Sequence, residues 1–419
     1  MTLPRLRDNI LALVAVQGLN FLIPLITLPF LARVLGASAL GEVVLVQSVM
    51  GFLVLLVEFG FVFSATRQVS THRHSREALT RLFSATWMAQ WLLAGLAAGL
   101  LGLSVMLAQW LDHALVPTGL WVWGFGVVLG TVLCPIWLLQ GLEALKAVAW
   151  LQALGRVLAL PLLFWTVQGP ADQDWALGFY SASSLGVGAL SLAWVVRQGL
   201  VGWQWPRWRD VVQALRESAL LFASRAAISL YTAAVPVALG VVVGPTALAF
   251  YSVADKVKQA IQALLVPVSQ ALYPRMSWLF VNDRPAAWAL LRRTAWAVSG
   301  ISALAGALAW ATADRLVWFL GGPGFEPAVD ILRWMAFIPC WIALSNLLGI
   351  QVMLPLGHSR WFARCVGLAC MVSLIGMVPM MHWRGAVGAA QWMMAIEALV
   401  TLSMAWVLWC YVGRPRVRT

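Results

Sequence analysis

The sequence predicts an all-α polytopic membrane protein, with twelve transmembrane helices arranged as two six-helix bundles. Three observations carry this prediction: the composition, the spacing of long apolar segments and the distribution of basic residues. Of the 419 residues, 62% are hydrophobic and 11% are charged. A soluble domain is about 45–50% apolar and about 25% charged. The composition therefore excludes an ordinary soluble protein.

Apolar segments long enough to cross a bilayer recur along the whole chain. A spanning helix needs about 20 predominantly apolar residues. Twelve segments meet this requirement, and the short connections between them leave no room for a sizeable soluble domain on either side. The predicted spans are 9–32, 39–64, 82–109, 119–140, 148–168, 176–196, 217–242, 246–273, 287–311, 328–354, 362–381 and 386–411.

The basic residues orient these spans. With the N-terminus in the cytoplasm, most arginines and lysines fall in cytoplasmic connections, and only Arg33, Arg315, Arg333 and Arg384 remain outside. Such a bias is typical of membrane proteins and predicts that both termini are cytoplasmic. The net charge of +12 is thus explained by topology, so no nucleic-acid partner is expected. The five cysteines lie in apolar segments without ligand spacing, so neither a disulfide nor a metal site is expected.

An internal repeat supports the same division. GASAL at 36–40 matches GPTAL at 244–248, and the same offset superimposes Arg67 on Arg275. Because six spans per half is an even number, the two copies have the same orientation, as in the parallel repeats of secondary transporters. We therefore predict an N-terminal bundle at 1–209 and a C-terminal bundle at 210–419.

Charged and amide side chains mark possible functional faces within the predicted spans. Charges at membrane depth cost about 2.5–3.5 kcal/mol on insertion scales and usually face a bundle interior or an aqueous cavity. Helical spacing places several of them on shared stripes. They are Gln17 and Asn20 in the first span, Gln47 and Glu58 in the second, Arg225 in the seventh, Asp255, Lys256, Lys258, Gln259 and Gln262 in the eighth, and Glu397 in the twelfth.

Structural explanations compete with functional ones at these positions. Asp255 and Lys258 have the i,i+3 spacing of an intrahelical pair, and Lys256 has the length to extend toward an interface. Glu58 and Glu397 each stand alone in an apolar span. Either is a protonatable coupling group or a neutral buried acid. The chain has no GxxxxGK[ST] motif, so nothing indicates ATP hydrolysis.

Several segments, in order, resemble polysaccharide flippases of the Wzx type. The resemblance begins with NILALVAVQGLNFLIPLITLPFLARVLGASALGEV and LVEFGFVFSATRQVS and continues over most of the chain. The segments that carry it are 9–43, 56–70, 139–146, 229–240, 250–260, 267–277 and 319–336.

This resemblance implies a two-bundle fold related to multidrug-and-toxin exporters, with spans one, two, seven and eight around a central cavity. It implies transport of an undecaprenyl-pyrophosphate-linked oligosaccharide across the bacterial inner membrane, with membrane lipids, a polymerase and export machinery as further partners. The expected energy source is a proton or sodium gradient, and no bound cofactor is expected.

Helical spacing then suggests roles for the polar residues. We expect Arg225, Lys256 and Lys258 to bind the pyrophosphate, and the amides Gln17, Asn20, Gln47, Gln259 and Gln262 to bind sugar hydroxyls. The acids Asp255, Glu58 and Glu397 are the candidates for ion coupling.

Other functions remain open from the sequence. The nearest are a drug/ion antiporter and a lipid II flippase of the same superfamily. A drug/ion antiporter for cations would favour an acidic cavity, whereas the polar spans here contain Arg225, Lys256 and Lys258. A membrane-embedded polysaccharide polymerase or ligase is a third possibility, but such enzymes typically need a large external loop, which the chain lacks.

Overall fold

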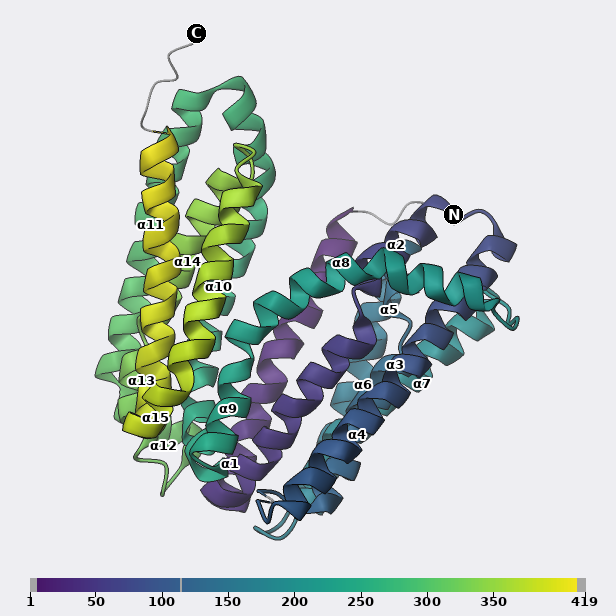
Figure 1. Cartoon of the computed structure of the whole chain (residues 1–419), viewed down its shortest axis with the longest axis horizontal. Coiled ribbons are helices and arrows are strands. Elements are labelled where there is room, and N and C mark those ends of the chain that lie inside the picture. Colours follow the sequence, from purple (N-terminus) through teal and green to yellow (C-terminus); the bar gives the residue numbers. More distant parts are fainter. Residues whose placement is uncertain (1–5, 114, 413–419) are drawn as a thin grey trace. The chain divides into compact units, whose positions relative to one another are not determined.

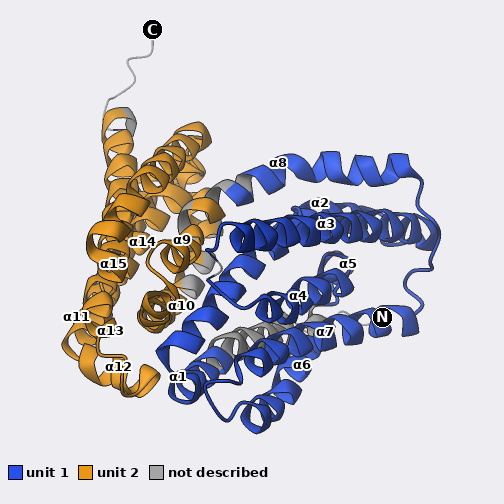
Figure 2. Cartoon of the chain, turned by 60° about the horizontal axis from the view of Figure 1, so that its bottom comes forward, with its two compact units in different colours: residues 1–226 blue, residues 227–419 orange. Residues whose placement is uncertain are grey.

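The computed structural model describes residues 6–113 and 115–412, which form helices joined by turns, with no strand among them. Side chains in these ranges are described except at 6–22, 145–149, 224, 227, 228, 231, 232, 266, 267, 270, 271, 274, 411 and 412. Two compact units make up the chain, residues 1–226 (unit 1) and 227–419 (unit 2), as Figure 2 shows by colour.

The helices of each unit follow one another with short connections (Figure 1). Unit 1 contains α1 (Leu6–Glu58), α2 (Phe61–Thr71), α3 (Arg76–Trp110), α4 (Thr118–Leu133), α5 (Ile136–Gly141), α6 (Leu145–Thr166), α7 (Gln173–Arg197) and most of α8 (Trp208–Thr232). Unit 2 contains the end of α8, α9 (Ala234–Val242), α10 (Pro245–Asn282), α11 (Arg284–Ala311), α12 (Ala313–Gly321), α13 (Ala328–Met335), α14 (Ile338–Leu348), the π-helix η1 (Gly349–Met353) and α15 (Ser359–Val412).

Within the described residues, seven helices are long and apolar enough to cross a membrane. Two of them are much longer than one span, because each joins two helices across a kink. The kinks fall at Gly36 in α1 (φ 74°) and at Gly385 in α15 (φ 59°). Only glycine adopts this backbone region without steric strain. All twelve predicted spans lie on helical segments, while the number that cross the membrane stays a prediction.

The two segments that suggested the repeat begin with glycines of similar backbone conformation. Gly36 has φ 74° and ψ 177°, and Gly244 has φ 120° and ψ 164°. The division between the compact units lies within α8, after residue 226, and therefore downstream of the predicted bundle boundary at 209/210. The parallel repeat itself stays a prediction.

Small residues hold the helices of unit 1 close together. Ser184 Oγ on α7 donates a hydrogen bond to the Val127 carbonyl oxygen on α4, 3.1 Å away. At Gly188 on α7, an added Cβ would lie 2.5 Å from the carbonyl oxygen of Gly130. Close backbone approach at small residues is typical of helix packing in membranes.

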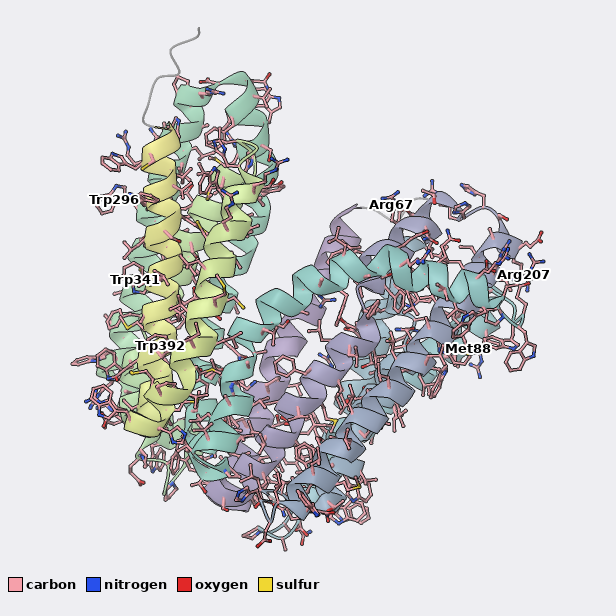
Figure 3. All side chains as sticks on the ribbon, in the orientation of Figure 1. Arg67, Met88, Arg207, Trp296, Trp341 and Trp392 are labelled. Carbon is pink, nitrogen blue, oxygen red and sulfur yellow. The ribbon has the colours of Figure 1, made fainter. Side chains whose placement is uncertain are left out.

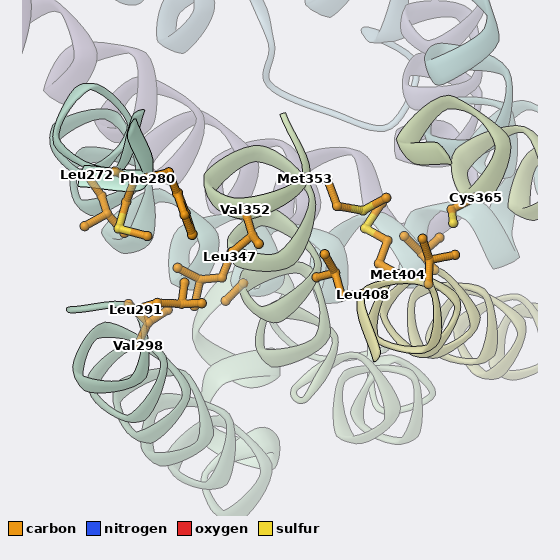
Figure 4. Packing of buried hydrophobic residues seen from close by; sticks show 14 of the residues in the cluster. Leu272, Phe280, Leu291, Val298, Leu347, Val352, Met353, Cys365, Met404 and Leu408 are labelled. Carbon is orange, nitrogen blue, oxygen red and sulfur yellow. The ribbon is translucent and has the colours of Figure 1, made fainter. Parts of the chain in front are cut away.

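A hydrophobic cluster joins α10, α11, α14, η1 and α15 in unit 2 (Figure 4). Met276, Val352 and Met404 are almost completely buried in it. Many large apolar side chains are exposed, among them Trp296 of unit 2, which Figure 3 labels. The exposed apolar side chains and the seven long apolar helices indicate a multi-pass membrane protein.

Candidate functional site

A tight turn at the end of α1 brings the first charged cluster together. Phe59 (φ 41°) and Gly60 (φ 76°) both have left-handed backbone conformations. At Gly60, an added Cβ would lie 3.1 Å from Leu221 Cβ and 3.1 Å from the backbone nitrogen of Phe222. Glycine is therefore required for α8 to pass this close to the turn.

Aromatic and hydroxyl contacts then fix α8 against α1 and α2. The rings of Phe59 and Phe222 stack with their centroids 4.5 Å apart. One turn along α2, Ser64 Oγ lies 2.6 Å from Ser218 Oγ. The next polar contact is a hydrogen bond from Gln68 to Glu217.

This packing places Arg225 of α8 beside Glu58, the last residue of α1. Arg225 Nη1 donates a hydrogen bond to Glu58 Oε2 over 2.9 Å, and the two residues form an ion pair. The Arg225 side chain is 36% exposed and that of Glu58 is 25% exposed. The Arg225 guanidinium also lies 5.9 Å from the centroid of the Phe63 ring. We call Glu58, Phe63 and Arg225 the Glu58 cluster.

The Glu58 cluster has the chemistry of an anion site in a resting, neutralised form. A guanidinium has five N–H donors, and one of them is used for Glu58. The exposed part of the group can still reach a second anion, and arginine binds phosphate with paired, charge-assisted hydrogen bonds. The sequence reasoning compared residues only within one helix, so it did not predict that Glu58 and Arg225 form a pair.

The predicted amides of unit 1 have different outcomes. Gln17 and Asn20 lie outside the described side chains. The Tyr180 hydroxyl forms hydrogen bonds with the side chains of both Thr27 and Gln47. The Nε2 atom of Gln47 is buried and has no hydrogen-bond partner among the described residues. Both N–H donors of the Gln47 amide therefore lack a partner among the described residues.

Unit 1 also contains a half-buried acid that the sequence reasoning passed over. Glu42 on α1 bonds to Gln173, and its Oε2 atom has no hydrogen-bond partner among the described residues. Its position near the turn at Gly36 gave little reason to separate it from an ordinary helix-end charge.

The second charged cluster lies inside unit 2, between α10 and α15. Lys258 is 5% exposed and pairs with Asp255, one turn before it on α10. Lys258 Nζ also lies 3.8 Å from Met393 Sδ, and the Tyr251 hydroxyl donates to the same sulfur over 3.4 Å. Glu397, one turn beyond Met393, is 5% exposed and feels the charge of Lys258.

We call Asp255, Lys258 and Glu397 the Lys258 cluster. It contains two acids and one base in a buried setting. A buried charge is costly unless it is paired. Because Asp255 already pairs with Lys258, the second acid, Glu397, is stabilised by binding a proton or another cation. The structure brings together three residues to which the sequence gave two different roles.

The remaining predicted residues of α10 differ in access. Lys258 is buried against Asp255, whereas Lys256 is half-buried and Gln259 is exposed. Gln259 Nε2 donates to the second oxygen of Asp255, so the Asp255 carboxylate bonds to both neighbours. Of the two predicted lysines, Lys256 is the more accessible to a substrate.

A cavity of about 320 Å³ lies further along α10, within unit 2, between α10, α11 and α14. Its wall is mostly apolar and carries the predicted residue Gln262 together with Ser269 and Asn346. Behind it, the fully buried Gln351 donates to Ser269 Oγ over 3.1 Å and to the Ser269 carbonyl oxygen over 2.9 Å. Among the described residues, the Ser269 hydroxyl hydrogen is thus left without an acceptor.

Asn346 and Gln351 were not predicted. They are separated by five residues, which does not place them on one face of an α-helix, and Gln351 belongs to the π-helix η1. π-helical turns often occur at functional sites. Two amides in the apolar second half of the predicted span 328–354 were the available signal. Among the described residues, no group of three His, Cys, Asp or Glu side chains is arranged to hold a metal ion.

Comparison with known proteins identifies the family. Residues 6–280 match the polysaccharide biosynthesis protein family. The chain belongs to this family. Two relatives named as candidate O-antigen transporters cover 95% of the chain. The one from Escherichia coli (strain K12) is 32% identical, with 95% of its own length matched, and the one from Shigella dysenteriae is 27% identical, with 99% matched.

This member of the polysaccharide biosynthesis family shares its fold with solved transporters. The lipid II flippase MurJ in an inward closed conformation aligns with a TM-score of 0.74, covering 96% of this chain and 87% of that one, at 10% identity. An inward-facing multidrug resistance MATE family transporter of the MOP superfamily aligns with a TM-score of 0.70, covering 92% and 93%, also at 10% identity. At 10% identity, these structural similarities establish the fold and nothing more specific.

Proposed function

We propose that the protein is a flippase, a secondary transporter without enzymatic activity. Its substrate would be an undecaprenyl-pyrophosphate-linked oligosaccharide used for polysaccharide biosynthesis, and it would move this lipid from the cytoplasmic to the periplasmic leaflet of the bacterial inner membrane. Membership in the polysaccharide biosynthesis family, relatives named as O-antigen transporters and a flippase fold support the proposal.

The observation that carries it is the partly exposed ion pair of Glu58 and Arg225. A lipid-linked pyrophosphate needs a cation at membrane depth, and Arg225 supplies one whose resting counter-ion lies on another helix. A pyrophosphate carries more charge than one carboxylate and has several acceptor oxygens. It can therefore replace Glu58 as the partner of Arg225.

This exchange of partners would couple substrate to an ion. When the pyrophosphate takes Arg225, Glu58 loses its counter-ion in a largely apolar setting. A free carboxylate there is unfavourable, so Glu58 binds a proton or a sodium ion. Substrate and ion would thus be linked without direct contact between them.

The Lys258 cluster would serve the same cycle from unit 2. Asp255 neutralises Lys258, and Glu397 is the excess acid that binds the coupling cation. Lys256 would provide the second accessible positive charge for the pyrophosphate. The amides Gln17, Asn20, Gln47, Gln259 and Gln262, joined by Asn346, would bind sugar hydroxyls.

Reconstitution tests the proposal. Proteoliposomes loaded with a fluorescent undecaprenyl-pyrophosphate-linked oligosaccharide would be treated with a membrane-impermeant glycosidase, with and without a proton or sodium gradient. We expect gradient-dependent exposure of the glycan on the opposite leaflet. Export of cationic dyes with no movement of any glycan lipid would favour the drug/ion antiporter. Movement of lipid II alone would favour the lipid II flippase.

A further inference from the structure

Unit 2 has a second concave feature, separate from both charged clusters. A groove of about 450 Å³ runs between α11 and α14 and is open on one side. Its volume lies in the range of roughly 300–1,000 Å³ that is typical of ligand sites. Both walls belong to helices that are long and apolar enough to cross a membrane, so a lipid is a ligand within reach of the groove.

The wall of the α11/α14 groove combines apolar side chains with a single charge. Leu291, Leu344 and Leu348 line it, and Arg292 is its only charged residue. Leu291 and Leu347 also take part in the hydrophobic cluster of unit 2, so they are packed from behind the groove (Figure 4). Arg292 is exposed and makes no ion pair with any described residue.

An aromatic residue marks the polar end of the groove. Trp288, one turn before Arg292, lines it and is 39% exposed. Its ring is held edge-on against the buried ring of Phe280, with centroids 5.6 Å apart. Tryptophan beside arginine is the pattern of side chains at the level of lipid headgroups.

The same end of unit 2 is strongly basic. α10 ends here, α11 begins here, and α14 leads through η1 into the start of α15. The arginines at these helix ends are Arg275, Arg284, Arg292, Arg293, Arg360 and Arg364. The nearest acid in sequence, Asp283, uses its carboxylate to accept the Ala286 N–H at the start of α11. Anionic lipids are attracted to basic clusters of this kind.

We propose that the α11/α14 groove binds an anionic glycerophospholipid. The phosphate contacts Arg292 below the Trp288 ring, and one acyl chain lies in the apolar channel lined by Leu291, Leu344 and Leu348. The apolar wall fits an acyl chain, and the unpaired guanidinium of Arg292 fits an anionic group. An anionic phospholipid supplies both. The inference is independent of the proposed transport function.

Lipid binding by the purified full-length protein tests this proposal. The protein in detergent would be titrated with phosphatidylglycerol and with phosphatidylcholine of identical acyl chains, and bound lipid would be counted by native mass spectrometry. We expect preferential binding of phosphatidylglycerol. In Arg292→Gln this preference falls about fivefold, the factor that corresponds to roughly 1 kcal/mol per basic residue near anionic lipid.

Two further variants make the test specific. Arg293→Gln removes the same charge from a residue that does not line the groove, and it should bind like the wild type. Ala295→Trp fills the channel and should weaken binding of both lipids. If this variant does not fold, the comparison of Arg292→Gln with Arg293→Gln stands alone.

Three results would overturn the proposal. One is equal binding of phosphatidylglycerol by the wild type and Arg292→Gln. Another is an equal loss in Arg293→Gln, which would indicate only general surface charge. The third is displacement of phosphatidylglycerol by undecaprenyl phosphate at lower concentration, in the wild type but not in Ala295→Trp. That result would assign the groove to the carrier lipid.

Discussion

Unit 1 and unit 2 each hold a charged cluster, and the two clusters differ in access. Arg225 shares its charge with one carboxylate from another helix, and about a third of its side chain is exposed. Lys258 is 5% exposed and pairs with Asp255 on its own helix, with a second acid, Glu397, close by. The first arrangement allows the partner of the cation to be exchanged from outside. The second excludes a large ligand and suits a small cation.

The difference also predicts what each charge does for stability. Removing one partner of a buried pair leaves an uncompensated charge and costs about 3–5 kcal/mol, whereas an exposed pair contributes about 0–1 kcal/mol. Lys258 should therefore behave as part of the folded core and Arg225 as part of a binding surface.

The largest expected effect is that of Lys258→Met. The variant leaves Asp255 and Glu397 without a base, so we expect about 3–5 kcal/mol of destabilisation. Heat unfolding in detergent at neutral pH measures it. Adding Asp255→Asn removes the unpaired partner and should recover most of the loss. A single variant as stable as the wild type would contradict the description of this cluster as a buried, coupled unit.

Arg225→Gln comes next and should separate transport from stability. We expect transport of a lipid-linked oligosaccharide to fall about tenfold or more, because charged hydrogen bonds contribute roughly 1.5–3 kcal/mol. The unfolding temperature should fall less than in Lys258→Met, because this pair is partly exposed, and Arg225→Lys should keep part of the activity. Wild-type transport by Arg225→Gln in proteoliposomes would remove this residue from the substrate site.

Glu58→Gln sharpens the comparison from the other side of the same pair. It removes the resting partner of Arg225, so a pyrophosphate lipid should bind about fivefold more tightly, as expected when roughly 1 kcal/mol of competition is lost. Transport should lose its dependence on the ion gradient. Equilibrium binding and gradient-dependent flipping are the two measurements, and unchanged coupling would show that Glu58 only balances charge.

A third ion pair, outside the predicted spans, is expected to contribute least to stability. Asp210 accepts hydrogen bonds from Arg81 Nε (2.8 Å) and Arg81 Nη2 (2.9 Å), and this bonding lowers the pKa of the Asp210 carboxyl. An acid with a lowered pKa stabilises the fold above its ordinary value of about 3.9. This contribution is lost as the pH falls through the folded-state pKa.

Asp210→Asn should therefore have the smallest effect of the series. The variant should unfold at a slightly lower temperature than the wild type near neutral pH, and the two should converge as the pH falls below about 4. A difference that persists or grows at lower pH would contradict this assignment. Melting curves recorded across acidic pH provide the test.

Much of the helical organisation was predictable from hydropathy, and the reason is physical. In a bilayer the backbone must satisfy its own hydrogen bonds, so a long apolar segment has few alternatives to a helix. The glycines at positions 36 and 244 were recognisable as matched points, and both have positive φ. The stripe on α10 was likewise predictable, because residues three and four apart share a face of one helix.

Contacts between helices were not predictable in this way. Glu58 and Arg225 are separated by 167 positions, and they meet because Gly60 lets α8 pass close to the turn after α1. Met393 contacts Lys258 through the packing of α15 on α10, and Glu397 lies one turn further along α15. Gln351 reaches Ser269 from a π-helical turn, whose register differs from the α-helical one assumed in the sequence reasoning.

The sequence by itself determined the membrane class, the positions of the helices and the kinds of polar group buried in them. Composition and spacing are local properties, and the bilayer restricts what they can form. Only the tertiary structure decided which charges are partners, which of them are buried and which remain open. Pairing depends on helix packing, and packing is governed by close contacts of small residues such as Gly60 that hydropathy does not register.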